Sequence, residues 1–429
     1  MPANIKNYST KLQQNPWAVC LTCSLFFLYE FIQMNMFNSI SPELIKTFHM
    51  NASELGNFSA MYLYATTAFV FFVGASLDKF SVRKLVLTAM ASCIIFTALF
   101  AVSSSLEMAK IFRFLSGISG AYCFLSCMVL ASRWIPSKQL ALASGLIVTM
   151  AMIGGTFAQT PLTLIVSQVG WRSAMLIDSL LGVVFLIAMY FIISDYPKIY
   201  EKKETAKVVN SDSMSKNIML AITSKQNWIA GTYTSLMNLM ILVIGATWGN
   251  AYLETVHHIS RADASFATMM IYIGTIIGSP LVGWYSDSIK SRKQPMLYGA
   301  VISLVLSIFV IYSTGISATT IAVTFFLLGL ITSTQIISYP LIFESNAKNI
   351  TGSSESLASV LILGGGAVCQ NLYGIFLDNA WNGTILEGAR IYSTSNHIYA
   401  FNMIPIAFAI SIALALMVKE TNCKHIDEA

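Results

Sequence analysis

The sequence predicts an all-α membrane protein in which twelve transmembrane helices form two pseudo-symmetric halves of six helices each. Hydrophobic residues make up 55% of the 429 residues, charged residues make up only 10%, and the mean hydropathy is +0.67. A soluble domain carries about 25% charged residues, so a chain this apolar is expected in a bilayer. A charged loop also occurs twice, 209 positions apart, each time between two long apolar segments. This repeat predicts that one structural unit is present twice.

Twelve apolar stretches are long enough to cross a membrane, since a helix needs about 20 residues to span a hydrocarbon core of about 30 Å. The first stretch is long and lacks a small-residue cleavage site, so we expect an uncleaved first span. The predicted spans are residues 17–40, 55–77, 85–104, 107–132, 141–167, 173–194, 228–253, 264–286, 295–314, 317–343, 354–377 and 398–418.

Positive charge is distributed unevenly between the loops. If both termini are cytoplasmic, 19 of the 25 Lys and Arg residues lie on the cytoplasmic side, where basic residues accumulate in membrane proteins. The only long loop on that side is polar and divides the spans six and six. We therefore predict an N-terminal half at residues 1–194, a cytoplasmic linker at 195–226 and a C-terminal half at 227–429.

Two patterns recur in the two halves. The loop pattern G-x(3)-D-x(4)-R-K begins at Gly74 and again at Gly283, and a Gly-Gly pair followed by Gln ends at Gln159 and again at Gln370. Glycine pairs allow membrane helices to approach closely, and a Gln inside a membrane needs a partner or a water-filled cavity. Either both Gln side chains are satisfied within helix packing, or they face each other across a central pathway.

Two six-helix halves, a cytoplasmic linker and a repeated loop resemble the major facilitator superfamily over the whole chain. Residues 74–84 resemble that family's motif between spans two and three, although Ser81 and Val82 replace the expected Gly and basic residue. Residues 113–121 resemble its fourth-span motif, and residues 170–172 resemble the common turn before span six. The resemblance implies a transporter that works by alternating access.

The resemblance also assigns the two charged loops to gating, because in that family they hold the halves together in one access state and release them in the other. A simple balance of surface charge is the alternative. The expected gating residues are Gly74, Asp78, Arg83, Lys84, Gly283, Asp287, Arg292 and Lys293.

Two ionisable residues lie deep within predicted spans, where charge is costly and marks function. Glu30 lies about 13 residues into span one, and Arg113 enters span four from the opposite side, so the two reach nearly the same depth at 1.5 Å per residue. In the family resembled, both spans line the substrate pathway. A neighbouring Arg favours the carboxylate and desolvation favours the acid, so the pair suits proton coupling. A purely structural ion pair is the alternative.

Other polar residues lie on helices expected near the pathway. Asp178, near the outer part of span six, is interpreted as a solvated surface residue and is not included in the predicted site. The expected pathway residues are Gln33, Tyr62, Tyr64, Gln159, Asn238, Gln335 and Gln370.

Other functional classes lack the residues that they need. No G-x(4)-G-K-[ST] phosphate loop is present, so transport must be driven by a gradient rather than by nucleotide hydrolysis. All five His residues fall in loops or at span ends, which leaves no metal cluster inside the membrane. We therefore expect no enzyme activity, no metal, no cofactor and no nucleic acid partner.

The sequence thus predicts secondary active transport of a small polar organic solute by proton symport, with an amino acid or organic anion favoured because one Glu and one Arg would suit either. The fifth span lacks the spacing of the exporter motif G-x(3)-G-P-x(2)-G-G, so import is preferred. A proton-coupled exporter of drugs or siderophores and a facilitated-diffusion uniporter are the alternatives. The expected partners are a small-molecule substrate, protons and the lipid bilayer, for a monomeric protein. A loose resemblance to nutrient importers of intracellular bacteria implies a bacterial inner membrane.

Overall fold

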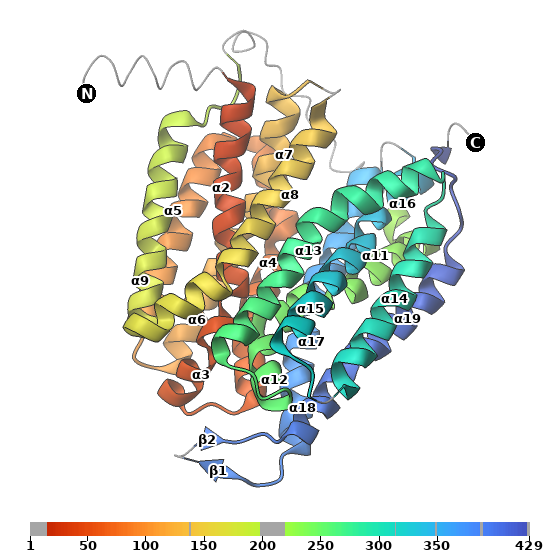
Figure 1. Ribbon diagram of the computed structural model, residues 1–429. Coiled ribbons are helices and arrows are strands. Elements are labelled where there is room, and N and C mark those ends of the chain that lie inside the picture. Colours follow the sequence, from red (N-terminus) through yellow and green to blue (C-terminus); the bar gives the residue numbers. More distant parts are fainter. Residues whose placement is uncertain are drawn as a thin grey trace. The chain divides into compact units, whose positions relative to one another are not determined.

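The computed structural model describes residues 15–136, 139–197, 219–313, 315–347, 350–386 and 389–426, and it is mostly helical (Figure 1). Ten helical stretches in these residues are long and apolar enough to cross a membrane. One of them, Leu142–Ile192, has 51 residues, more than twice the length that one span needs, and covers the fifth and sixth predicted spans. The 28-residue helix Ala52–Lys79 covers the second predicted span. The all-α fold with twelve spans is confirmed.

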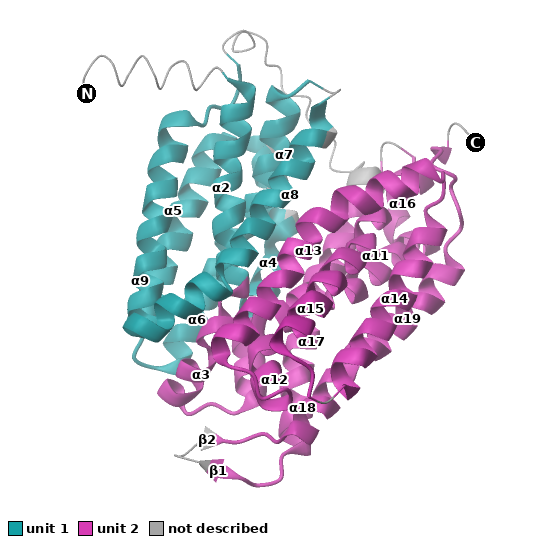
Figure 2. Ribbon diagram, in the orientation of Figure 1, with its two compact units in different colours: residues 1–34, 61–207 teal, residues 35–60, 208–429 magenta. Residues whose placement is uncertain are grey.

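Two compact units make up the chain (Figure 2). Unit 1 comprises residues 1–34 and 61–207, and unit 2 comprises residues 35–60 and 208–429. The end of the first predicted span and the start of the second therefore pack within unit 2. Residues 198–218 of the predicted linker lie outside the described residues.

Unit 1 contains most of the first six predicted spans. Serine caps begin two of its helices: the Ser81 hydroxyl accepts from Lys84 N–H at 3.2 Å, and the Ser105 hydroxyl accepts from Met108 N–H at 3.3 Å. Each cap satisfies an amide that has no partner within the helix. The helices are α2 (Pro16–Asn35), α4 (Ala52–Lys79, from residue 61), α5 (Val82–Ala101), α6 (Leu106–Gly120), α7 (Tyr122–Trp134), α8 (Leu140–Phe157) and α9 (Thr160–Ile192).

The turn predicted before span six is a kink in α9. Gly170 has φ 77° and ψ 163°, a backbone conformation that glycine adopts without steric cost. After the kink, the ring of Trp171 lies 5.4 Å from that of Phe100, and Arg172 Nη2 donates to Ser103 O at 3.0 Å. These contacts hold the start of span six against the end of α5.

Unit 2 contains the remaining spans, several of which are irregular. Span seven passes from α11 (Lys225–Met237) through a π-helix, η2 (Met240–Trp248), into α12 (Gly249–Val256), and every residue of η2 is buried. Irregular backbone at membrane depth is tolerated where protein surrounds it. The other helices are α3 (Phe37–Phe48), α13 (Arg261–Ser288), α14 (Lys293–Tyr312), α15 (Ala318–Thr332), η3 (Ser333–Ile337), α16 (Ser338–Ser345), α17 (Thr351–Ala380), α18 (Thr394–Phe401) and α19 (Met403–Met417).

A short hairpin precedes the last span, with β1 (Ile385–Leu386) antiparallel to β2 (Ala389–Arg390). The carboxylate of Asp378, at the end of α17, accepts hydrogen bonds from Arg390 at 3.0 Å and from Tyr392 at 2.5 Å. These bonds attach the hairpin to the helix that it follows.

Glycines let α13 and α15 cross in close contact. A Cβ at Gly329 would lie 2.0 Å from Ile271 O, and a Cβ at Gly274 would lie 2.2 Å from Phe326 O. Small residues are used in this way in membranes, where packing rather than hydrophobic burial drives helix association.

Polar contacts explain why residues 35–60 belong to unit 2. Asn38 Nδ2 donates to Asn250 Oδ1 at 3.1 Å, while Asn250 donates its N–H to Asn38 Oδ1 at 2.8 Å and its Nδ2 to Asn38 O at 3.0 Å. Arg261 forms a two-pronged ion pair with Glu43 at 2.6 and 3.0 Å, the geometry in which Arg and carboxylate interact most strongly.

Candidate functional site

A cluster of buried polar side chains lies inside unit 1, around Arg113 of α6. The Arg113 side chain is 1% exposed, and its Nη1 donates to Gln33 O at 2.6 Å. Its Cζ lies 4.6 Å from the centroid of the Tyr62 ring, and a desolvated Arg over an aromatic face is favourably placed. The predicted site residues Arg113, Gln33 and Tyr62 are therefore brought together.

Glu30 of α2 belongs to the same cluster. Its side chain is 5% exposed, with Tyr62, Cys123 and Arg113 in electrostatic range. Its Oε2 accepts no hydrogen bond from a described residue. Glu30 and Arg113 thus interact electrostatically within one cluster, and a direct ion pair between them stays a prediction. Because a buried carboxylate is costly, Glu30 suits a group that gains and loses a proton.

Glycines of the fourth-span motif make room for this cluster. A Cβ at Gly120 would lie 2.1 Å from the Tyr62 hydroxyl and 3.3 Å from Glu30 Cγ, and a Cβ at Gly117 would lie 2.3 Å from Tyr62 O. The motif residues noticed in the sequence therefore allow α4 to approach α6 and leave space for the tyrosine.

Asp178 of α9 is also part of the cluster, and the expectation that it is a surface residue is wrong. It is 4% exposed, and its Oδ2 accepts a hydrogen bond from Gln33 Nε2. Gln33 Oε1 in turn accepts from Thr97 Oγ1 at 3.0 Å. Membrane depth can be counted along a sequence, but the direction in which a helical residue points cannot be read from a span that is apolar all round.

The predicted pathway residues of unit 2 form separate contacts. Asn238 Nδ2 donates to Gln335 Oε1 at 2.5 Å. Gln370 Nε2 donates to Leu242 O at 2.5 Å, while its Oε1 has no hydrogen-bond partner among the described residues. The structure therefore brings Asn238 and Gln335 together, and it places Gln370 against the π-helix.

The last two predicted pathway residues lie in unit 1. Gln159 is fully buried immediately before α9, and Tyr64 is half-buried on α4. Since Gln159 and Gln370 belong to different units, their facing arrangement stays a prediction.

The first charged loop is closed by a carboxylate that the sequence analysis missed. Asp195, just after α9, accepts from the Ser81 hydroxyl at 2.6 Å and from Arg83 N–H at 2.9 Å. Negative charge at the start of a helix is stabilised by its free amides. Arg83 Nη2 also donates to Tyr190 O at 2.8 Å. The available signal was the position of Asp195, directly after the last span of its half.

The second charged loop repeats this arrangement in unit 2. Glu420, just after α19, accepts from the Ser291 hydroxyl at 2.6 Å and from the N–H groups of Arg292 and Lys293 at 2.9 and 3.0 Å. Lys293 Nζ donates to Leu416 O at 2.6 Å. Each half thus closes its loop with a carboxylate from its own C-terminal end.

The remaining gating residues differ between the two loops. Arg292 donates to Asp287 and to Glu344, both at 2.6 Å, whereas the side chain of Asp78 lies outside the described residues. The Lys84 side chain is exposed. Among the described residues, no neighbouring atom lies within 4 Å of a Cβ placed at Gly74 or at Gly283, so close packing does not explain these two glycines.

We expect Glu420→Gln to lower thermal stability at neutral pH. Burial raises the pKa of Glu420, but hydrogen bonds from Arg292 N–H, the Ser291 hydroxyl and Lys293 N–H outweigh it and hold the pKa below its usual range. A carboxyl whose pKa is lower in the folded state stabilises the fold above its unfolded pKa, near 4.3, and this contribution is lost as pH falls through the folded pKa.

The check is the melting temperature of both proteins as a function of pH. The difference between them should be largest at neutral pH and should shrink in acid. Glu107→Gln is the control, because Glu107 forms only a surface pair with Lys110, which is worth little. A difference that stays constant across the pH range would contradict the prediction.

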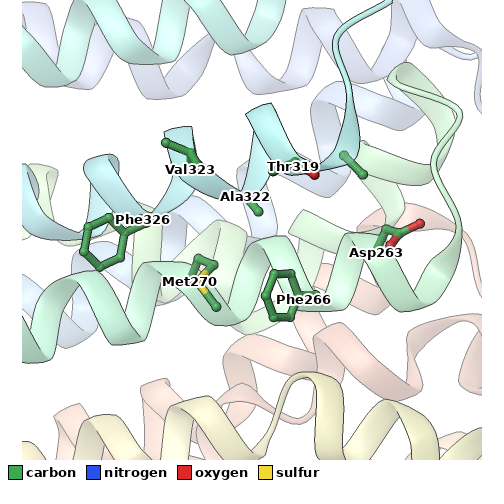
Figure 3. Close-up of a pocket in the computed structure, with 8 residues that line it drawn as sticks. Asp263, Phe266, Met270, Thr319, Ala322, Val323 and Phe326 are labelled. Atoms are coloured by element: carbon green, nitrogen blue, oxygen red, sulfur yellow. The ribbon is translucent and has the colours of Figure 1, made fainter.

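A surface depression of about 370 Å³ lies between α13 and α15 (Figure 3). It is lined mainly by apolar side chains, including Phe266, Met270 and Phe326, with Asp263 at one end. Asp263 accepts a hydrogen bond from the Ser260 hydroxyl at 2.7 Å, as expected near a helix start. Small-molecule sites bring several polar groups together, and this depression does not.

Among the described residues, no group of three or more His, Cys, Asp or Glu side chains is placed to hold a metal ion. In unit 1, Glu30, Arg113 and Asp178 are three buried ionisable groups that all contact or neighbour Gln33 or Tyr62.

Comparisons with known proteins agree with the predicted family and fold. A family model described as the Major Facilitator Superfamily matches residues 23–369. A probable hexose phosphate transport protein of Chlamydia muridarum is 23% identical over 344 residues, which cover 73% of this chain and 75% of the relative. A gentisate transporter of Corynebacterium glutamicum is 22% identical over 367 residues, which cover 83% and 80%.

Solved structures show the same fold. The nucleoside transporter NupG superposes with a TM-score of 0.72 at 12% identity, covering 93% of this chain and 98% of that one. The family match, the relatives and the apolar helices together lead to one conclusion: this chain belongs to the Major Facilitator Superfamily and is a multi-pass membrane transporter of a small molecule, not an enzyme.

Proposed function

We propose that this protein imports a small organic anion together with protons, by alternating access of its two halves. The observation that carries the proposal is the burial of Arg113 and Glu30 in one cluster, where the two side chains interact electrostatically. A guanidinium stays charged at all physiological pH values, so the charge of the pair is set by the carboxyl group.

Protonation of Glu30 would turn a neutral pair into a cationic one. Net charge inside a membrane is costly, so the cationic state favours the entry of an anion. By linkage, the bound anion equally favours the protonated carboxyl group. Proton and anion therefore bind together, which is the requirement for symport.

The relatives support an anion over an amino acid. The two relatives described above carry the names of organic anions, a hexose phosphate and gentisate. Phosphates and carboxylates are also the groups that a planar guanidinium recognises best.

The proposal further assigns the two halves, residues 1–194 and 227–429, to the moving bodies, with both termini in the cytoplasm of a bacterial cell. The two charged loops, each closed by its own carboxylate, would hold the ends of the helices as the halves move.

Thermal stabilisation of the purified protein tests the substrate class. Gentisate, glucose 6-phosphate, a neutral nucleoside and a neutral amino acid would be compared at acidic and at alkaline pH. A ligand at about 100 times its Kd stabilises by about 2.7 kcal/mol, and we expect this for an anion, more strongly in acid.

Arg113→Gln should remove the effect of the anion, whereas Lys46→Gln, a change of an exposed residue in the last turn of α3, should keep it. Stabilisation by the neutral nucleoside or the amino acid, with no response to either anion, would overturn the proposal.

A further inference from the structure

The proposed function leaves one buried acid of unit 1 without a role. Asp178 of α9 is 4% exposed, and its Oδ1 accepts no hydrogen bond from a described residue. No described Lys, Arg or His forms an ion pair with its carboxylate. A structural aspartate inside a membrane would be expected to be paired with a cation, whereas Asp178 interacts with the uncharged side chains of Gln33 and Tyr29.

Gln33 connects Asp178 to the arginine of the proposed site. Its Nε2 donates to Asp178 Oδ2, and its main-chain oxygen accepts from Arg113 Nη1 at 2.6 Å. Thr97 Oγ1 donates to Gln33 Oε1 at 3.0 Å and so orients the amide with its nitrogen toward the aspartate. The amide can continue to donate to Asp178 when only one of the two carboxylate oxygens carries a proton.

The surroundings of Asp178 contain no group that neutralises it. The Tyr29 hydroxyl of α2 interacts with the carboxylate, and Cys93 of α5 lies in electrostatic range; both side chains are neutral acids at physiological pH. Helix α8, which also packs against α9, has no titratable residue. On α9 itself, Arg172 is bonded instead to the main-chain oxygens of Ala101 and Ser103.

Charge balance then requires a second proton. With both carboxyl groups ionised, Glu30, Asp178 and Arg113 carry a net charge of about −1, and one proton only brings this cluster to neutrality. A second proton is needed before the cluster becomes cationic and attracts an anion.

We propose that Asp178 is a second proton acceptor of the transport cycle, linked to Arg113 through Gln33, so that about two protons accompany each monovalent anion. This inference rests on the proposed function. A proton from the side of high concentration binds the carboxylate of Asp178, stays on it while the anion is bound, and leaves to the opposite side after the anion is released. The complete cycle moves one net positive charge inward.

Infrared difference spectroscopy of the purified full-length protein tests Asp178 without any substrate. The spectrum is recorded between acidic and alkaline pH, and the C=O stretching band of a protonated carboxyl group is followed. Asp178→Asn should remove one such band and leave a band that Glu30→Gln removes. Asp263→Asn is the matched control, since Asp263 is exposed and an Asn also serves at a helix start.

Transport of gentisate into proteoliposomes tests the stoichiometry. Asp178→Asn should lower the proton count from about two to about one per anion, and so lower accumulation about tenfold for a gradient of one pH unit. Gln33→Met should leave both infrared bands but shift the pH at which they titrate. An unchanged infrared spectrum in Asp178→Asn, or an unchanged proton count, would overturn the inference.

The two proposals fail in different ways. If Asp178 titrates in the infrared spectrum but no anion stabilises the protein at any pH, the proposed substrate class is wrong. If anions stabilise the protein and Asp178→Asn removes no pH-dependent carboxyl band, the role given to Asp178 is wrong.

Discussion

Uptake driven by membrane potential alone should disappear in Glu30→Gln. With two protons per monovalent anion, the wild-type protein carries one net charge inward, and a potential of 100 mV supplies about 2.3 kcal/mol per charge, equivalent to about fiftyfold accumulation. Glutamine keeps the shape of a protonated Glu30 but cannot release a proton. Only one proton then accompanies the anion, transport becomes electrically neutral, and the potential no longer drives it.

The measurement is uptake of the anion into proteoliposomes that carry a potassium diffusion potential and no pH gradient. Exchange of labelled for unlabelled anion should continue in Glu30→Gln, which shows that the variant folds and binds. The double variant Glu30→Gln with Asp178→Asn should retain only exchange and should not accumulate the anion under any gradient. Potential-driven accumulation at the wild-type level in Glu30→Gln would contradict the assignment of this residue.

Loss of the buried guanidinium in the second charged loop should cause the largest change in stability. Arg292 is 7% exposed and donates Nη2 to Glu344 Oε1 at 2.6 Å, and Glu344 is itself 6% exposed. Arg292→Met leaves this carboxylate buried and uncompensated, which costs on the order of 3 kcal/mol. Thermal unfolding in detergent should show a clear fall in melting temperature.

A double variant separates the ion pair from simple loss of packing. Arg292→Met combined with Glu344→Leu should recover much of the lost stability, because apolar residues often replace a buried pair at little cost. Asp287→Asn is the control, since the Asp287 side chain is 66% exposed and its pair with Arg292 should contribute less than about 1 kcal/mol. Equal stability of the single and double variants would show that the uncompensated charge on Glu344 does not cause the loss of stability in Arg292→Met.

Sequence alone predicts the number of spans and part of the site. Apolar length identifies the helices, and the same counting places Glu30 and Arg113 at one depth, where the structure brings both into one buried cluster. The position of Asp178 around its helix was not predictable, because a helix that meets lipid on one side and protein on the other is apolar on both.

Hydropathy also does not predict where the helices are irregular. The π-helix at Met240–Trp248 and the short helix Ser333–Ile337 lie within spans whose apolar character continues unbroken. Their hydrogen bonding depends on neighbouring helices, as with Gln370 Nε2, which donates to Leu242 O. Such contacts join residues more than a hundred positions apart and leave no local pattern.

The amide pair of Asn38 and Asn250 bears on how the chain arose. The two residues are 212 positions apart, close to the spacing of the repeated loop and of the repeated glycine pair. They therefore lie near equivalent positions of the two repeats, and each donates to the other. Contacts of this kind are typical of a two-fold axis, where one residue of a subunit meets its own copy. In an ancestral homodimer of six-helix subunits, a single asparagine would have supplied both partners at once, before gene fusion placed them in one polypeptide.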